Sequence, residues 1–234
     1  TIPKLDTSNG TNFFRMFTGC RALTSLPQID TSKGENFGSM LYYCSSLAKI
    51  PLLNTSKGKI FNSMFSYCSS LTEVPLLDTS NGTDFNGMFN YCTSLTSVPQ
   101  LDLSNATDVT GMFLGCSKLT TVPKLDIRNA TKTSSMFYKC TALESAEITT
   151  AKETVSIFQG CTSLKNLTIG EGFYTSIYLG DSPNLTQESL HGMIENLADL
   201  TGLDACSFRV GSTNLAKIDA EHIAMLEAKN WSYS

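Results

Sequence analysis

The chain has 234 residues, of which 41% are hydrophobic and 16% are charged, and its formal net charge at pH 7 is −4. This composition is typical of a folded domain, and the negative charge argues against nucleic-acid binding, which needs a basic surface. No apolar run approaches the ~20 residues of a membrane-spanning helix, so we expect no membrane insertion.

The chain repeats itself every 24 residues from its first residues onward. Four residue types keep this step, namely cysteine (Cys20, Cys44, Cys68, Cys92, Cys116, Cys140), methionine (Met16, Met40, Met64, Met88, Met112, Met136), proline (Pro3, Pro27, Pro51, Pro75, Pro99, Pro123) and leucine (Leu23, Leu47, Leu71, Leu95, Leu119, Leu143). A period of this size indicates a solenoid, in which each coil buries its apolar side chains against the next coil. Because Thr1 falls inside a repeat, we expect further coils or another domain before it.

One coil can be followed over residues 87–107. Met88, Phe89, Cys92 and Leu95 have the spacing of one face of a helical or 3₁₀ turn. The run 96–98 favours a short strand, which the following proline limits because proline lacks a backbone amide. Small polar residues over 102–107 predict a turn. We therefore expect each coil to combine a short strand, a turn and a helical or irregular return, with the strands of successive coils forming a parallel sheet.

The cysteine column predicts buried free thiols. Cysteine is small and often buried, so it suits a crowded interior column. Parallel in-register side chains point the same way, which disfavours disulfides, and a line of sulfurs does not converge on a tetrahedral metal. We expect Cys20 to Cys140 to be buried and reduced, with no metal and no cofactor.

An acidic column follows each proline, with asparagine in its third place. Its members are Asp6, Asp30, Asn54, Asp78, Asp102 and Asp126. Carboxylates in a row are compatible with a calcium ladder, or with side chains that accept hydrogen bonds from the amides of the following turn. We favour the turn, because Asn54 serves it as well as aspartate does.

Positions that vary from coil to coil are candidates for the surface. Leu52 and Leu76 stand where neighbouring coils carry glutamine or lysine, and Tyr43, Tyr67 and Tyr91 occupy one position in three successive coils. Tyrosine is enriched at recognition sites, so these five residues are our candidate partner-binding residues. The alternative is that the tyrosine rings only pack on one another across coils.

After residue 140 the repeat shortens and then gives way to helical patterns. A 21-residue coil aligns Cys161 with the cysteines, and a further coil carries Ser182 in that place. Helical spacing then follows with Thr186 as a candidate N-cap, 206–210 is a candidate strand, and Asp219 is a candidate N-cap of a last helix. We expect a solenoid over 1–185 and a C-terminal cap over 186–234, packed on the last coil as part of one domain.

The motif Met-Phe-x-x-Cys-x-x-Leu-x-x-Val-Pro-x-Leu-Asp over Met88 to Asp102 closely resembles the BspA-type leucine-rich repeats of bacterial surface proteins. Residues 184–202 and 211–231 resemble the C-terminal cap of such arrays in gut bacteria and their phages. The resemblance implies an α/β fold: a right-handed leucine-rich-repeat solenoid of 24- and 21-residue coils with a short parallel sheet and a helical C-terminal cap. It also implies a secreted or cell-surface location. The proline in each repeat departs from the common repeat and predicts a shorter sheet.

Catalysis has little support in the sequence. The two histidines, His191 and His222, lie outside the regular coils and lack metalloprotease spacing, so we expect them on solvated helix faces. We therefore expect no enzyme, but a non-catalytic extracellular binding or adhesion module, monomeric, that presents its surface to a protein or glycan partner of host or bacterial origin. The alternative is a structural spacer or stalk that holds another domain away from a cell or phage surface.

Overall fold

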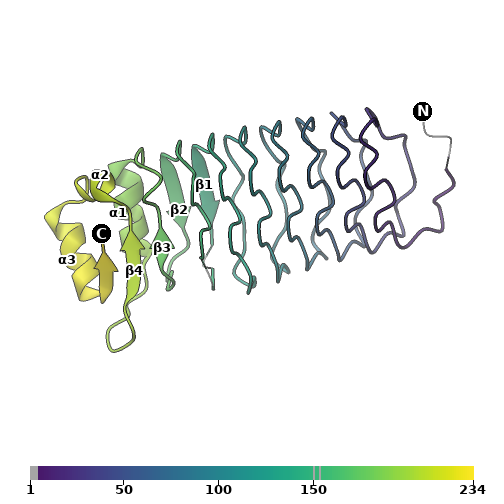
Figure 1. Ribbon diagram of the computed structural model, residues 1–234. Coiled ribbons are helices and arrows are strands. Elements are labelled where there is room, and N and C mark those ends of the chain that lie inside the picture. The colour runs from purple at the N-terminus through teal and green to yellow at the C-terminus, as the bar shows by residue number, and fades with distance from the viewer. Residues whose placement is uncertain (1–4, 150, 153) are drawn as a thin grey trace.

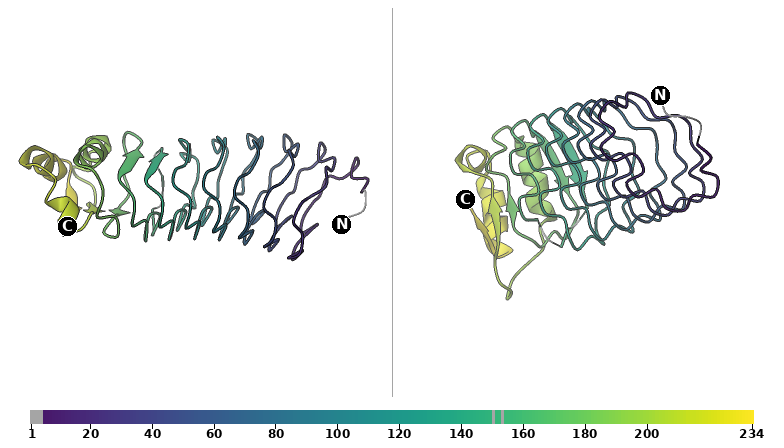
Figure 2. Two further views of the ribbon diagram at one scale, coloured as in Figure 1. Left: turned by 90° about the horizontal axis from the view of Figure 1, so that it is seen from above. Right: turned by 45° about the vertical axis from the view of Figure 1, so that its right-hand side comes forward.

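The repeats fold into coils that stack along one axis, with the helices gathered at the C-terminal end (Figure 1). The computed structural model describes residues 5–149, 151–152 and 154–234, so Pro3 at the start of the proline column lies outside the described residues. We number the coils 1 to 8 by the residue at the cysteine position, from Cys20 in coil 1 to Cys161 in coil 7 and Ser182 in coil 8. Two further views show the same row of coils (Figure 2). The expected repeat solenoid is thereby confirmed.

Backbone hydrogen bonds join each coil to the next. The amides of Phe37, Ser39, Leu41 and Tyr43 donate to carbonyls of coil 3 at 2.8 to 2.9 Å. The alternate amides close tight turns inside the coil, for example from Met40 to the carbonyl of Phe37 at 3.1 Å. The expected helical or 3₁₀ turn is therefore wrong for this segment, which forms linked turns instead.

Extended strands are rare in the coils that carry proline. Coils 1 to 5 contain isolated parallel bridges, such as Asn36 with Ile60, but no strand among their described residues. Strand β1 (Ser145–Ile148) pairs in parallel with β2 (Asn166–Ile169), with Ser145 opposite Asn166. Glu147 of β1 stands at the proline position, so the ladder forms where the missing amide is restored. The expectation that proline shortens the sheet is confirmed.

The interior is a column of stacked aromatic rings, thiols and aliphatic side chains. One stack contains Phe13, Phe37, Phe61 and Phe85 and a second contains Phe65, Phe89, Phe113, Phe137 and Phe158, with ring centroids 5.2 to 5.6 Å apart. Gly82 lies against the first stack, and a Cβ atom on it would come within 2.2 Å of the Phe85 ring. In coil 5 the same positions carry Ala106 and Val109. Alanine in place of glycine is thus accompanied by the smaller valine in place of phenylalanine.

The C-terminal segment adds three helices and a second sheet. Helix α1 (Gln187–Asn196) contacts β2, and α3 (Ala220–Ala228) contacts α1, with the short α2 (Ser212–Leu215) between them in sequence. Strands β3 (Ile177–Tyr178), β4 (Cys206–Arg209) and β5 (Trp231–Tyr233) form a parallel sheet in that order. β3 comes from the end of the solenoid, so this sheet joins the C-terminal segment to the last coil.

Both predicted N-caps of the C-terminal helices are confirmed. The Thr186 side chain accepts a hydrogen bond from the amide of Ser189, and Asp219 accepts one from the amide of His222. The Lys229 ammonium, just after α3, donates to the carbonyls of Ile194, Glu195 and Leu197 at 2.8 to 3.1 Å. This lysine supplies donors to the C-terminal carbonyls of α1, which a helix leaves unpaired.

Candidate partner-binding surfaces

An open groove of about 1010 Å³ runs across coils 1 to 4 on the side of the post-proline residues. The candidate residues Leu52 and Leu76 lie in it with 63% and 64% of their surface exposed. Their neighbours Leu53 and Leu77 point inward and are buried. The alternation is that of an extended chain, so each coil presents one side chain to the groove and one to the core.

Two backbone carbonyls in the groove have no hydrogen-bond partner among the described residues, because leucine replaces glutamine. The Gln28 amide donates to the carbonyl of Leu52 in the next coil at 3.1 Å, and the Gln100 amide donates to that of Lys124 at 2.9 Å. Leucine has no donor, so in the described chain the carbonyls of Leu76 and Gln100 receive no such bond. The two substitutions therefore expose both apolar side chains and backbone acceptors.

The floor of the groove contains further unpaired polar groups. The Thr55 hydroxyl is buried and has no hydrogen-bond partner among the described residues, whereas the equivalent Thr31 donates to the carbonyl of Asn54 at 2.9 Å. The amides of Leu53 and Leu77 also make no backbone hydrogen bond within the described chain. Such groups are usually satisfied, so this floor is suited to form hydrogen bonds with groups from outside the chain, with the two amides as donors and the Thr55 hydroxyl as donor or acceptor.

Aspartates border the groove and form the predicted turns. The carboxylates of Asp30, Asp78 and Asp102 accept hydrogen bonds from the amides two residues later at 2.9 to 3.1 Å, and Asn54 does the same at 3.2 Å. The turn interpretation of this column is confirmed. Hydrogen bonds from the following serine lower the pKa of Asp30 and Asp78, which keeps these carboxylates ionised.

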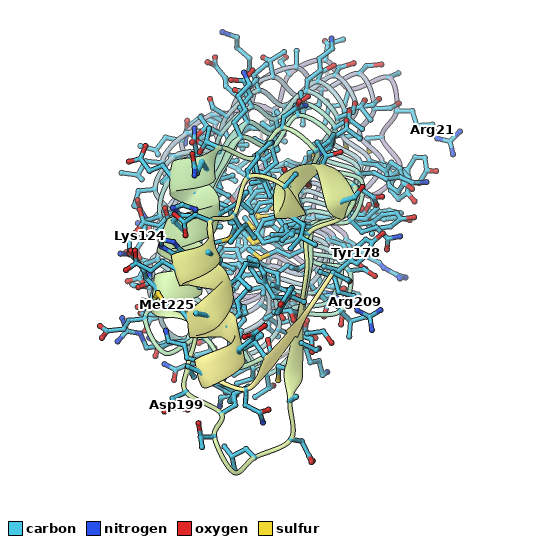
Figure 3. The ribbon with its side chains drawn as sticks, turned by 90° about the vertical axis from the view of Figure 1, so that its left-hand side faces the viewer. Arg21, Lys124, Tyr178, Asp199, Arg209 and Met225 are labelled. Atoms are coloured by element: carbon cyan, nitrogen blue, oxygen red, sulfur yellow. The ribbon has the colours of Figure 1, made fainter. Side chains whose placement is uncertain are left out.

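The three candidate tyrosines form a separate stack. Ring centroids are 4.5 Å apart for Tyr43 and Tyr67 and 5.1 Å apart for Tyr67 and Tyr91, and Arg21 lies over the Tyr43 ring. Tyr43 and Tyr67 are half-buried rather than exposed, because each ring covers the next. In the view along the solenoid, Arg21 and Lys124, which is in the same column as Leu52, lie on opposite sides (Figure 3). The structure therefore does not bring the leucines and tyrosines together.

Each of these tyrosines has an unusual backbone conformation. Their φ angles are 61°, 61° and 54°, in the left-handed region that non-glycine residues rarely adopt. Gly19 and Gly115 occupy the same position in the flanking coils, and the ring of Tyr91 lies so close to Gly115 that a Cβ there would be 2.8 Å from it. A non-glycine residue in this region carries a local strain of roughly 1–3 kcal/mol. Lys139, in the same column, has a φ of 59° without belonging to the stack, so the stacking of coils rather than the tyrosine rings imposes this conformation.

The thiols of coils 2 to 7 are buried and donate to backbone carbonyls. Each Sγ lies 3.0 to 3.1 Å from a carbonyl oxygen of the preceding coil, as Cys116 does with Phe89. Burial raises the pKa of Cys116 and Cys161 to about 12, so these thiols are protonated and weakly nucleophilic at neutral pH. In coil 8 the Ser182 hydroxyl also donates to the preceding coil, but its acceptor is the carbonyl of Cys161 itself, at 2.9 Å.

Two expectations about single residues are wrong. Cys20 is exposed, because among the described residues no coil covers the side of coil 1 on which the other thiols find their carbonyls. The histidines do not lie on solvated faces, since the side chains of His191 and His222 are only 17% and 12% exposed and their rings stack on each other. Helical spacing alone did not reveal that the two helices meet at these residues.

Comparison with solved structures gives the class of fold. The leucine-rich repeat protein of T. pallidum superimposes with a TM-score of 0.51 at 20% identity, covering 72% of this chain and 80% of that one. A leucine-rich repeat protein from Bacteroides ovatus gives a TM-score of 0.31 at 18% identity, covering 84% of this chain and 72% of that one. The first of these similarities shows a solenoid of the leucine-rich-repeat type.

The family follows from the sequence. The chain matches the family described as "Mycoplasma protein of unknown function, DUF285" over residues 1–76 and 52–151, and it belongs to this family. No curated protein matches it significantly. None of the described helices is both long enough and apolar enough to cross a membrane.

Proposed function

We propose that this chain is a protein-binding repeat module and that its groove across coils 1 to 4 holds an extended segment of the partner. The observation that carries the proposal is that Leu52 and Leu76 stand where other coils carry a bridging glutamine. This exposes apolar side chains and leaves the carbonyls of Leu76 and Gln100 without a partner in the described part of the chain. An extended peptide offers apolar side chains to cover the leucines, and its amides and carbonyls can pair with the unpaired carbonyls and amides of this surface.

The charge of the groove selects the chemistry of the partner. Asp30, Asp78 and Asp102 line it, and no lysine or arginine is among its lining residues. An occupant that complements this surface combines aliphatic side chains with lysine or arginine. A glycan offers hydroxyl donors but no aliphatic side chains to cover the leucines, so we favour a protein over a glycan.

The finer features of the proposal rest on the sequence resemblance. BspA-type repeats, a secreted or cell-surface location, adhesion as the biological role and a monomeric state all come from that resemblance. The capping of the solenoid by residues 186–234 is supported by the packing of α1 on β2 and of β4 on β3. The leucine-rich-repeat fold supports binding rather than catalysis.

A selection with displayed peptides tests the proposal. The immobilised full chain is panned against a random peptide library, and the affinity of enriched peptides is measured by fluorescence anisotropy. We expect aliphatic and basic sequences to be enriched, and we expect Leu52→Gln or Leu76→Gln to weaken binding at least ~10-fold, as loss of a buried anchor does. Glutamine is the matched substitution because Gln28 and Gln100 already occupy this column.

The tyrosine stack provides the competing surface. Tyr67→Gly removes the ring at a φ of 61°, which glycine adopts without strain. If the glycine variant loses binding while both leucine variants keep it, the site is the tyrosine stack. If no peptide is enriched over an unrelated protein, the peptide-binding proposal fails and the spacer alternative is favoured.

A further inference from the structure

Two histidines and an aspartate meet where the last helix packs on the end of the solenoid. His191 is on α1, His222 is on the first turn of α3, and Asp219 is the N-cap of α3. The imidazole rings stack with centroids 3.7 Å apart and planes 15° apart. Within the described part of the chain, a potential metal ligand atom from each of the three residues lies within 4.8 Å of the other two.

The distances between the ligand atoms are close to those of coordination by one ion, although the two stacked rings must turn to direct their nitrogens at it. Asp219 Oδ2 is 3.7 Å from His191 Nε2, and Asp219 Oδ1 is 2.8 Å from His222 Nδ1. Ligand atoms at ~2.0–2.1 Å from a tetrahedral Zn²⁺ are about 3.3 Å apart, between these two values. Glu195 Oε1 lies 3.6 Å from His222 Nε2, on the far side of the ring. A carboxylate in that place is the usual partner of a metal-bound imidazole.

A capping role for Asp219 explains only part of this cluster. It accounts for the hydrogen bonds from the amide and the ring of His222, at 2.9 and 2.8 Å. It does not account for His191, whose Nε2 atom is buried and has no hydrogen-bond partner among the described residues. This nitrogen lies 3.7 Å from the Asp219 carboxylate, beyond hydrogen-bond distance, so it is available as a ligand for a cation placed between the two groups.

We propose that His191, His222 and Asp219 form a binding site for Zn²⁺ or a similar borderline divalent ion. His191 Nε2, His222 Nδ1 and a carboxylate oxygen of Asp219 are the protein ligands, and water completes the tetrahedron. His222 changes tautomer, so that its Nε2–H donates to Glu195 and no net proton is released. Both rings turn about χ2 and leave the stack, because parallel rings cannot direct two lone pairs at one point. The ion then cross-links α1 and α3.

Titration of the full chain with ZnCl₂ tests this site. The two accessible thiols are removed first, as Cys20→Ser and Cys206→Ser, because thiolates also bind zinc. In this background we expect one equivalent to bind, as measured by isothermal titration calorimetry after chelator treatment, and the melting temperature to rise with zinc. We expect His191→Gln and His222→Gln each to weaken binding at least ~10-fold.

Two further variants separate ligation from folding. Asp219→Asn keeps an N-cap oxygen but is a poorer ligand, so it should weaken zinc binding even if a histidine variant folds badly. Glu188→Gln changes an exposed residue of α1, the helix that carries His191, and this variant should bind zinc like the parent. The absence of saturable binding in the parent would overturn the proposal. So would an affinity that stays unchanged when both histidines are replaced.

Discussion

At the scale of single residues, the cysteine column shows how a repeated side chain can fill space and also form a hydrogen bond. Each thiol of coils 2 to 7 lies in the core and donates to a carbonyl of the preceding coil. The register of the repeat predicted the burial of this column. It did not predict the acceptor, because the carbonyl is 27 residues earlier than Cys116, in a turn that the sequence did not specify.

The thiols of coil 1 and of the C-terminal sheet should therefore react faster than the thiols of the interior. Cys20 is exposed and Cys206 is half-buried, while the other thiols are buried. We expect titration of the native protein with a thiol reagent to modify Cys20 readily, Cys206 more slowly and the remaining six only after denaturation. Rapid modification of Cys92 or Cys116 in native protein would contradict the packing described above.

The buried thiols should also make stability depend on alkaline pH. The pKa of Cys116 is raised to about 12, whereas an unfolded thiol titrates near ~8.5, so the unfolded state loses its proton first. The contribution of each buried thiol to the free energy of unfolding is fully present below about pH 8.5. Above that pH it falls by roughly 1.4 kcal/mol per pH unit until the folded thiol ionises. We expect Cys116→Ser, which imitates Ser182, to give a shallower decline in denaturant unfolding between about pH 9 and 10.5. An identical slope would show that this thiol ionises equally in both states.

At the scale of elements, the sequence predicted what local chemistry determines. The side chains of Thr186 and Asp219 cap helices, and Asp78 and Asn54 close their turns, because each acts on amides two or three residues away. It did not predict the linked turns over 37–44, because serine and tyrosine there adopt positive φ angles that only the neighbouring coils stabilise. It also missed β3 and β5, which are two and three residues long and pair with a distant strand.

The pairing of glycine with phenylalanine along the core is a further element-level constraint. A methyl group on Gly82 would lie 2.2 Å from the Phe85 ring, so Gly82→Ala should lower the free energy of unfolding by roughly 1–3 kcal/mol. Coil 5 carries Ala106 with Val109, which suggests the compensating change Phe85→Val. We expect the double variant to lose less stability than the sum of the two single variants, as measured by denaturant unfolding. Additive losses would contradict the steric account.

At the scale of the whole molecule, stability is distributed because each coil contacts only its neighbours. The last coil is covered by the C-terminal segment, where α1 buries Leu190, Met193 and Ile194. A chain ending at residue 185 would expose this apolar surface, so we expect it to aggregate in light scattering and to lose its cooperative melting. Deletion of 93–116 removes one whole repeat and is the matched control, which should remain monomeric. A truncated chain that stays monomeric with an unchanged melting curve would refute the capping role.

The candidate site could be predicted from the sequence only in part. The contrast of Leu52 and Leu76 with glutamine in the adjacent coils was visible, and the structure places both leucines in the groove. The unpaired carbonyls and the buried Thr55 hydroxyl were not visible, because they depend on how neighbouring coils face each other. The tyrosines also differ from the residues at the same position in neighbouring coils, but they form a separate stack. A difference between coils therefore identifies positions on the surface, but it does not show which of them lie on the same face.

Hydrogen exchange of the full chain, with and without a selected peptide, tests the central claim most directly. The amides over 52–55 and 76–79 form no backbone hydrogen bonds among the described residues, so they should exchange rapidly in the free protein. The bound peptide should slow exchange in these two segments and leave the tyrosine turns over 39–44 and 63–68 unchanged. Protection of the tyrosine turns, with no change in the groove segments, would contradict the assignment of the groove as the binding site.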